Sequence, residues 1–241
     1  MSRQRAVDFV YFDAGMTLLR VRPSVGWHYA EIAREFGVEA EPMALTAGFI
    51  AAWRHCQRHC AVHPDVAYGL TQEESLGFWS EVVRETFRQS GQTPPADPAY
   101  YRRVFEAFAS ARCWELYPEV EPALEYLAGA GLRFGVLSNW DRRLRQTLTE
   151  LEMLPRLAAL VISSEVGAEK PSDRIFAAAR TAAHGASRFG LVGDEPEADG
   201  FGALRAGWRQ CLVWRSEKPA PEGLRSAPSL TEAVRRLVEE G

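Results

Sequence analysis

The second half of the chain alternates short apolar runs with helical stretches, and this alternation restricts the fold more than any other feature of the sequence. From Pro118 onward, each run is joined to the next helical stretch by a short connection. Strands and helices that alternate in this way form a parallel sheet covered by helices. The expected strands are Arg133–Leu137, Ala159–Ile162, Phe189–Val192 and Gln210–Trp214, and the expected helices are Pro122–Ala130, Asp141–Leu151, Ser172–Ala183, Ala198–Ala206 and Thr231–Glu239.

The N-terminal stretch adds a first strand that ends in a carboxylate. Val7–Phe12 is rich in β-branched and aromatic residues, as expected for a strand that is buried on both faces of a parallel sheet. Asp13 follows it directly, and Gly15 lets the chain turn away. Open α/β sheets bind ligands at the carboxyl ends of their strands, so Asp13 is predicted to lie in a binding crevice.

Between Pro23 and Arg112 the apolar residues recur at helical spacing, without any run typical of a strand. Four helices are expected there, and the third begins at Thr71 with Glu74 completing a capping box. The predicted fold is therefore α/β. A Rossmann-like, doubly wound parallel sheet is formed by residues 1–20 and 113–241, and a helical-bundle cap domain is inserted at residues 21–112.

Polar residues follow several of the expected strands, where the ends of parallel strands meet. Asp13 comes directly after a strand, Ser138 and Asn139 follow another, Gly193 and Asp194 follow a third, and Lys170 precedes a helix. The two carboxylates can hold Mg²⁺ through hard oxygen ligands, while the hydroxyl and the ammonium bind and neutralise phosphoryl oxygens. With the metal screening anion from anion, Asp13 can attack phosphorus and form an acyl phosphate.

In order and spacing, four stretches resemble the motifs of the haloacid dehalogenase superfamily: FDAGMTLL, VLSNWD, EVGAEKPSDRIF and LVGDEPEADGFGALRAGW. The helical insert falls where family members with a helical cap carry theirs. The resemblance implies a hydrolase with Asp13 as nucleophile and with Mg²⁺ held by Asp13, the backbone carbonyl of Gly15 and Asp194. It further implies phosphate contacts from Ser138, Asn139 and Lys170, with Lys170 also counted among the catalytic residues and Thr17 and Asp199 in supporting roles.

Gly15 departs from the pattern of the family's phosphatases, which usually carry a second Asp at this position to protonate the leaving group. Glycine cannot donate a proton, so roughly 10²- to 10⁴-fold of rate can be missing. The expected activity is therefore that of a phosphatase, slowed by the missing acid, that acts on a small phosphorylated metabolite. Two alternatives stay open: a catalytically weak phosphate-binding or regulatory protein, and a 2-haloacid dehalogenase-like hydrolase, because halide leaves without a proton.

Composition excludes several classes of partner. Net charge is −4, with 28 basic against 32 acidic residues and no long block of one sign, so neither nucleic acid nor an anionic membrane is expected. No apolar stretch approaches the roughly 20 residues that span a bilayer. Four scattered cysteines and a polar N-terminus without a signal-like run predict a reduced, cytoplasmic protein, and the sequence does not predict its oligomeric state.

Two further groups have simpler explanations than a binding site. The stretch HCQRHCAVH places His55 and His59, and Cys56 and Cys60, one helical turn apart, which resembles a zinc-ligand spacing. The cysteines nevertheless continue an apolar helical stripe, so burial is favoured over zinc binding. Asp141 and Arg142 are expected to cap and flank a helix, and a substrate role for them is the minority interpretation.

Overall fold

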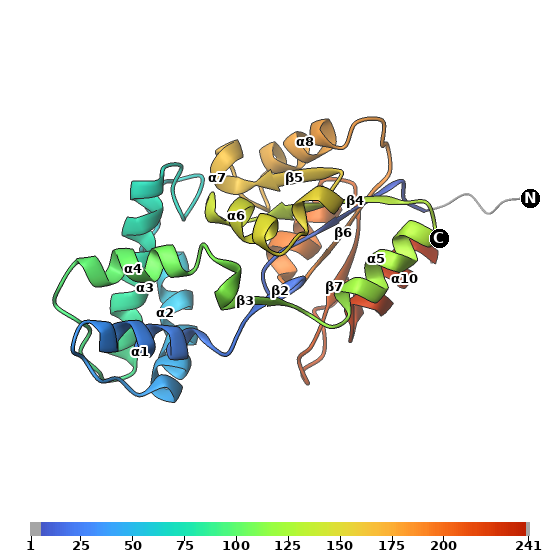
Figure 1. Ribbon diagram of the computed structural model, residues 1–241. Helices are drawn as coiled ribbons and strands as arrows, with labels where there is room; N and C mark the ends of the chain where they lie inside the picture. Colours follow the sequence, from blue (N-terminus) through green and yellow to red (C-terminus); the bar gives the residue numbers. More distant parts are fainter. Residues whose placement is uncertain (1–5, 240–241) are drawn as a thin grey trace, which may run out of the picture. The chain divides into compact units, whose positions relative to one another are not determined.

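The computed structural model describes residues 6–239 and divides into two compact units, each of which is considered by itself (Figure 1). The sheet unit consists of the described residues up to Arg20, of Leu116–Asn139, and of the described residues from Met153 onward. The helical unit consists of Val21–Glu115 and Trp140–Glu152. The chain passes from one unit to the other near β2 (Leu19–Val21) and β3 (Trp114–Leu116), which pair with each other.

Within the described residues, the sheet unit is built on a six-stranded parallel sheet with the order β5-β4-β1-β6-β7-β8. All residues of the central strand β1 are fully buried, as its β-branched and aromatic composition predicts. The strand order reverses on either side of β1, and open α/β sheets bind their ligands at such a point, at the carboxyl ends of the strands. The strands are β1 (Phe9–Phe12), β4 (Arg133–Ser138), β5 (Ala159–Ile162), β6 (Phe189–Gly193), β7 (Arg209–Val213) and β8 (Ser226–Ala227).

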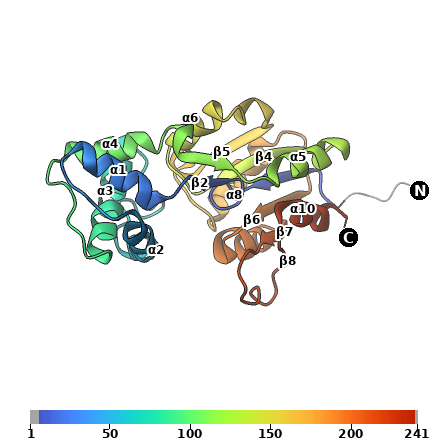
Figure 2. The ribbon, with the colours of Figure 1, turned by 60° about the horizontal axis from the view of Figure 1, so that its bottom comes forward.

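Helices cover both faces of this sheet (Figures 1 and 2). Leu191 packs in a core with Phe176 of α8, whereas a side chain at the neighbouring Gly190 would meet Leu237 of α10, because successive strand residues face opposite sides. The Tyr11 hydroxyl donates to the carbonyl of Ala179 at 2.7 Å and ties β1 to α8. The helices are α5 (Val120–Gly129), α7 (Ser163–Val166), α8 (Asp173–Ala182), α9 (Gly202–Arg205) and α10 (Leu230–Glu239), with a 3₁₀ turn at Leu154–Arg156 and a π-helix at Pro196–Phe201.

The helical unit forms around two aromatic-rich cores. The capping box expected at the start of the third helix is present, with both the Thr71 and the Glu74 hydrogen bonds formed. Cys56 lies in the second core beside Phe78 and Val82, as its place on the apolar stripe predicts. The helices are α1 (Val25–Glu35), α2 (Pro42–His59), α3 (Gln72–Gln89), α4 (Ala99–Ala107) and α6 (Arg143–Glu150), with a 3₁₀ turn at Ala111–Cys113.

The helix expected at Asp141–Leu151 forms as α6, but it groups with the helical unit, whereas the boundaries drawn from the sequence place it in the sheet domain. The Thr147 hydroxyl donates to the carbonyl of Ala109, and the Arg143 guanidinium donates to the carbonyl of Phe105. These contacts join residues far apart in the sequence, so no local pattern encodes them.

The remaining differences from the predicted elements concern short segments. The strands β2, β3 and β8 and the helix α7 have two to four residues each and carry no readable periodicity. In place of one helix at Ala198–Ala206 there is a π-helical turn followed by α9. Within residues 6–239, no disulfide joins the cysteines. No helix in this part of the chain is both long and apolar enough to cross a bilayer.

Candidate active site

Asp13 lies at the carboxyl end of β1 and is 9% exposed. Its backbone N–H donates to the carbonyl of Val192 at 2.9 Å, which continues the pairing with β6. Its Oδ1 accepts from the Ser138 hydroxyl at 3.0 Å and from the Lys170 ammonium at 2.7 Å. The parallel register of β1 with β4 places Ser138 at the same edge of the sheet. Asp13 and Ser138 therefore lie together, as expected for residues that follow neighbouring parallel strands.

Lys170 is buried and uses all three of its N–H groups. The Nζ atom donates to Asp13 Oδ1 at 2.7 Å, to Asp199 Oδ1 at 2.6 Å and to the carbonyl of Leu137 at 2.8 Å. Burial acts to lower the pKa of Lys170, but the charges of the two carboxylates outweigh burial and raise it. Lys170 is therefore a permanent ammonium that holds Asp13 and Asp199 in place.

Asn139 holds the loop that carries Lys170. Its amide nitrogen donates to the carbonyl of Lys170 at 2.9 Å, and its carbonyl oxygen accepts from the N–H of Lys170 at 2.7 Å. This pair of bonds fixes the backbone from which the ammonium reaches Asp13. The geometry gives Asn139 a positioning task in addition to the phosphate contact expected from the motif.

Asp194 follows β6, and Asp199 organises the loop around it. Asp199 Oδ2 accepts from the N–H groups of Asp194 and Glu195 at 3.1 and 3.0 Å. A side chain at Gly193 would lie 2.2 Å from the Asp199 carboxyl group, so only glycine permits this approach. Thr17 donates to Asp194 Oδ1 at 3.1 Å. The expected supporting residues Thr17 and Asp199 thus both contact the Asp194 loop.

Burial and the neighbouring charges raise the pKa of two carboxyl groups in the acidic cluster. Burial raises the pKa of Asp13 to about 6, with the Lys170 charge opposing the shift. Burial, together with the charges of Asp13 and Asp199, raises the pKa of Asp194 to about 8. Both shifts show that the folded chain disfavours several carboxylate charges at this place. A bound cation would relieve this repulsion.

The donor set fits a hard divalent cation. One carboxylate oxygen from each of Asp13, Asp194 and Asp199 lies within 4.8 Å of the others. Both oxygens of Asp199 are engaged, whereas Oδ2 of Asp13 and of Asp194 accept no hydrogen bond within the described chain. These two residues are therefore the side chains best placed to bind a metal ion.

The zinc alternative at His55, Cys56, His59 and Cys60 does not assemble. Among the described residues, the acidic cluster is the one group of three or more His, Cys, Asp or Glu residues able to share an ion. Cys56 is buried against apolar side chains, as described above.

The turn after Asp13 supplies no acid. Gly15 pairs with Leu19, and the N–H of Met16 donates to the carbonyl of Leu19 at 2.8 Å. The left-handed residue of this turn is Met16, with φ 55°, rather than Gly15. Gly15 therefore provides no proton donor where the family's phosphatases usually carry an Asp. Its own backbone does not take the left-handed conformation that would favour glycine.

Comparison with known proteins places this site in a family. A model of haloacid dehalogenase-like hydrolases matches residues 8–207. The chain belongs to this family.

Relatives within the haloacid dehalogenase-like hydrolases cover most of the chain. The human haloacid dehalogenase-like hydrolase domain-containing protein 3 is 33% identical over 185 residues, which make up 76% of this chain and 72% of the relative. A phosphoserine phosphatase of Thermus thermophilus is 31% identical over 238 residues, 93% of this chain and 94% of the relative. The solved structure of an L-2-haloacid dehalogenase from Xanthobacter autotrophicus matches with a TM-score of 0.67 at 16% identity and covers 95% of this chain and 98% of that one. This last likeness concerns the fold alone.

The family motifs do not include Arg215, which the sequence prediction also missed. Arg215 follows β7, donates to the carbonyl of Met16, and forms an ion pair with Glu119 at 3.3 Å. Its position just after a strand that neighbours β6 is the signal from which it could have been found, because that strand ends at the same edge of the sheet.

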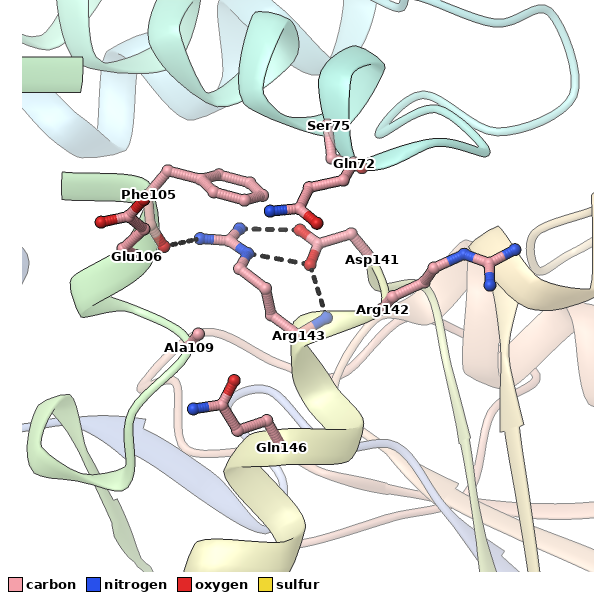
Figure 3. Close-up of a pocket in the computed structure, with 9 residues that line it drawn as sticks. All are labelled: Gln72, Ser75, Phe105, Glu106, Ala109, Asp141, Arg142, Arg143 and Gln146. Atoms are coloured by element: carbon pink, nitrogen blue, oxygen red, sulfur yellow. Dashed lines mark hydrogen bonds and ion pairs between the residues drawn. The ribbon is translucent and has the colours of Figure 1, made fainter. Parts of the chain in front are cut away.

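The helical unit contains a pocket of about 390 Å³ (Figure 3). Asp141 and Arg143 form a buried ion pair beside it at 2.7 Å, and the guanidinium lies 3.8 Å from the centre of the Phe105 ring. The Arg143 N–H donates to Asp141 Oδ1 at 3.0 Å, but the N-cap residue of α6 is Arg142, so Asp141 lies one residue before the cap position that the sequence suggested. Trp79 donates to Asp141 Oδ2 at 2.8 Å. The pocket is lined by residues of α3, α4 and α6 and of the segments that follow α4 and precede α6: Gln72, Ser75, Phe105, Glu106, Ala109, Asp141, Arg142, Arg143 and Gln146.

Proposed function

We propose that this haloacid dehalogenase-like hydrolase is a Mg²⁺-dependent phosphatase that acts on a small phosphorylated compound with Asp13 as nucleophile. The observation that carries the proposal is the buried Lys170 ammonium, which bonds Asp13 and Asp199 while Asp194 completes a cluster of carboxylates able to share a cation. The similarity to a phosphoserine phosphatase over nearly its whole length supports the same class of reaction.

The metal would be held by Asp13, Asp194 and the backbone carbonyl of Gly15. When bound, Mg²⁺ would supply positive charge that lets an anionic phosphate approach an anionic nucleophile. Thr17 and Asp199 would keep Asp194 oriented through the contacts described above.

The chain's own residues account for binding and attack. The Lys170 charge favours the ionised form of Asp13, and Ser138 and Lys170 orient its carboxylate. When substrate enters, the hydroxyl and one ammonium N–H would exchange their bonds to Asp13 for bonds to phosphoryl oxygens. An oxygen of Asp13 would then form a bond to phosphorus while the bond to the leaving alcohol oxygen breaks, and water would hydrolyse the resulting acyl phosphate.

Gly15 sets the expected substrate range of this chemistry. An alkyl alcohol leaves poorly without a proton, whereas a phenol leaves readily as phenolate. The protein is therefore expected to cleave aryl phosphates faster than alkyl phosphates. The proposed partner is a small molecule rather than nucleic acid or a membrane, and the absence of disulfides in the described chain is compatible with a reducing cytoplasm.

Gly15 also favours a second candidate, a 2-haloacid dehalogenase-like hydrolase, since halide needs no proton to leave. The clustered carboxylates speak against it, because without a metal ion they outnumber the Lys170 ammonium and would repel an anionic haloacid.

The test is a panel of aryl and alkyl phosphates and of 2-haloacids, each with and without Mg²⁺. Asp13→Asn removes the nucleophile, and Asp8→Asn is the matched control, because Asp8 pairs with Arg188 at the opposite end of β1. Phosphate release that needs Mg²⁺ and is lost in Asp13→Asn alone supports the proposal. Halide release without Mg²⁺ would establish the dehalogenase instead, and no turnover of any compound would favour a binding or regulatory protein.

A further inference from the structure

We infer that Arg215 is a positioning residue for the turn that would present the Gly15 carbonyl to the metal, an inference that rests on the proposed function. Neither the family motifs nor the comparisons assign Arg215 a role. All the groups involved belong to the sheet unit.

The turn contains a conformation that its sequence does not favour. Met16 has φ 55°, a left-handed value that is uncommon for residues other than Gly, Asn and Asp. Met16 is 56% exposed, so burial of this residue does not hold the conformation in place. Other contacts must therefore stabilise the backbone here.

Hydrogen bonds hold the two peptide groups that flank Met16. The N–H of Met16 donates to the carbonyl of Leu19 at 2.8 Å. In a planar trans peptide the carbonyl points opposite to the N–H, so this bond sets the direction of the Gly15 carbonyl. The next peptide group is held by Arg215, whose guanidinium donates to the carbonyl of Met16. Together the two bonds fix the rotation of the backbone at Met16.

Arg215 is itself held in place by two neighbours. Its guanidinium lies 3.9 Å from the centre of the Tyr117 ring and forms an ion pair with Glu119 at 3.3 Å. The Tyr117 N–H donates to the carbonyl of Leu18 at 2.9 Å, and its hydroxyl contacts the Met16 sulfur at 3.9 Å. Two separate segments, one with Arg215 and one with Tyr117 and Glu119, thus converge on this turn. Such a network suits a turn that must keep a carbonyl aimed at an ion, and loss of residues that orient metal ligands typically weakens metal binding by roughly 10- to 100-fold.

The test measures Mg²⁺ affinity by isothermal titration calorimetry, without substrate, for the wild type and for Arg215→Met. Methionine keeps an apolar stem against Tyr117 and removes the hydrogen bonds. Arg156→Met is the matched control, because Arg156 pairs with Glu121 in the same unit and has similar exposure. We expect roughly tenfold weaker Mg²⁺ binding for Arg215→Met and unchanged binding for the control.

A second substitution separates positioning from general stability. Met16→Asn introduces a residue that adopts the left-handed conformation more readily. In the Arg215→Met background it is expected to recover a large part of the lost Mg²⁺ affinity, which a merely structural loss would not allow. Hydrogen exchange of the amides of residues 15–19 in the metal-free proteins should rise in Arg215→Met and fall again in the double variant.

The outcomes separate this inference from the proposed function. Wild-type affinity in Arg215→Met would overturn the positioning role and leave the Mg²⁺ site intact. Weaker binding without recovery by Met16→Asn would also overturn it, in favour of a general loss of stability. Absence of Mg²⁺ binding in the wild type would overturn the proposed function and this inference with it.

Discussion

Replacing Lys170 by methionine is expected to destabilise the protein by about 4 kcal/mol at pH 8, the range for breaking a buried ion pair, and by much less at pH 5. The side chain of Lys170 is 1% exposed, and methionine fills nearly the same volume. The substitution removes three hydrogen bonds and leaves the carboxylates of Asp13 and Asp199 without their cation.

The pH dependence follows from the pKa of Asp13. Burial already raises it to about 6 against the opposing charge of Lys170, so removal of that charge raises it further. A carboxyl group whose pKa is higher in the folded than in the unfolded state stabilises the fold below its unfolded pKa near 4. That stability is lost as the pH rises through the folded pKa, by roughly 1.4 kcal/mol per pH unit for each such group.

Urea unfolding of the wild type and of Lys170→Met between pH 5 and pH 8 measures the effect. Lys218→Met is the control, because Lys218 is exposed and is the other lysine of the chain. A cost that is equal at pH 5 and pH 8, or that stays below about 1 kcal/mol throughout, would refute a buried ammonium that compensates the two carboxylates.

Three further predictions concern the acid, the metal and the helical unit. Gly15→Asp should raise kcat for alkyl phosphates by roughly tenfold or more and kcat for aryl phosphates by less. No gain in a folded, Mg²⁺-binding variant would show that the missing acid does not limit the rate. Because burial raises the pKa of Asp194 to about 8, Mg²⁺ affinity measured by calorimetry should rise roughly ten- to fiftyfold from pH 6 to pH 8, and a flat profile would place the ion elsewhere. Asp141→Asn should lower the free energy of unfolding by about 3 kcal/mol in urea titrations at pH 7, because it breaks the buried ion pair with Arg143. A loss below about 1 kcal/mol would mean that the Trp79 and backbone hydrogen bonds alone hold α6.

The parallel sheet could be predicted because most of its strands have a clear local sequence pattern. β1, β4, β5, β6 and β7 each have a continuous apolar run followed by a turn or a helix start, and the long helices of the insert have clear stripes or a capping box. The short strands β2 and β3 could not be predicted, because three residues carry no period and pairing between distant segments decides them. The grouping of α6 with the helical unit likewise depends on distant contacts, such as that of Arg143 with Phe105.

The meeting of Asp13, Ser138 and Lys170 could be predicted from the rule that parallel strands end at one edge. The second function of Asn139, which holds the Lys170 backbone, could not, because it depends on the path of a loop. The left-handed residue of the first turn could not be predicted either. Glycine adopts that conformation most readily, but here Met16 adopts it and Gly15 does not. The roles of these residues in catalysis stay predictions.

Beryllium fluoride tests the central claim most directly, because with Mg²⁺ it mimics a phosphoryl group on an aspartate. The account predicts a ¹⁹F NMR signal of bound fluoride with the wild type and with Asp8→Asn, and none with Asp13→Asn. Binding by Asp13→Asn at wild-type strength, or the absence of binding by the wild type in the presence of Mg²⁺, would contradict the assignment of Asp13 as a phosphoryl-accepting nucleophile.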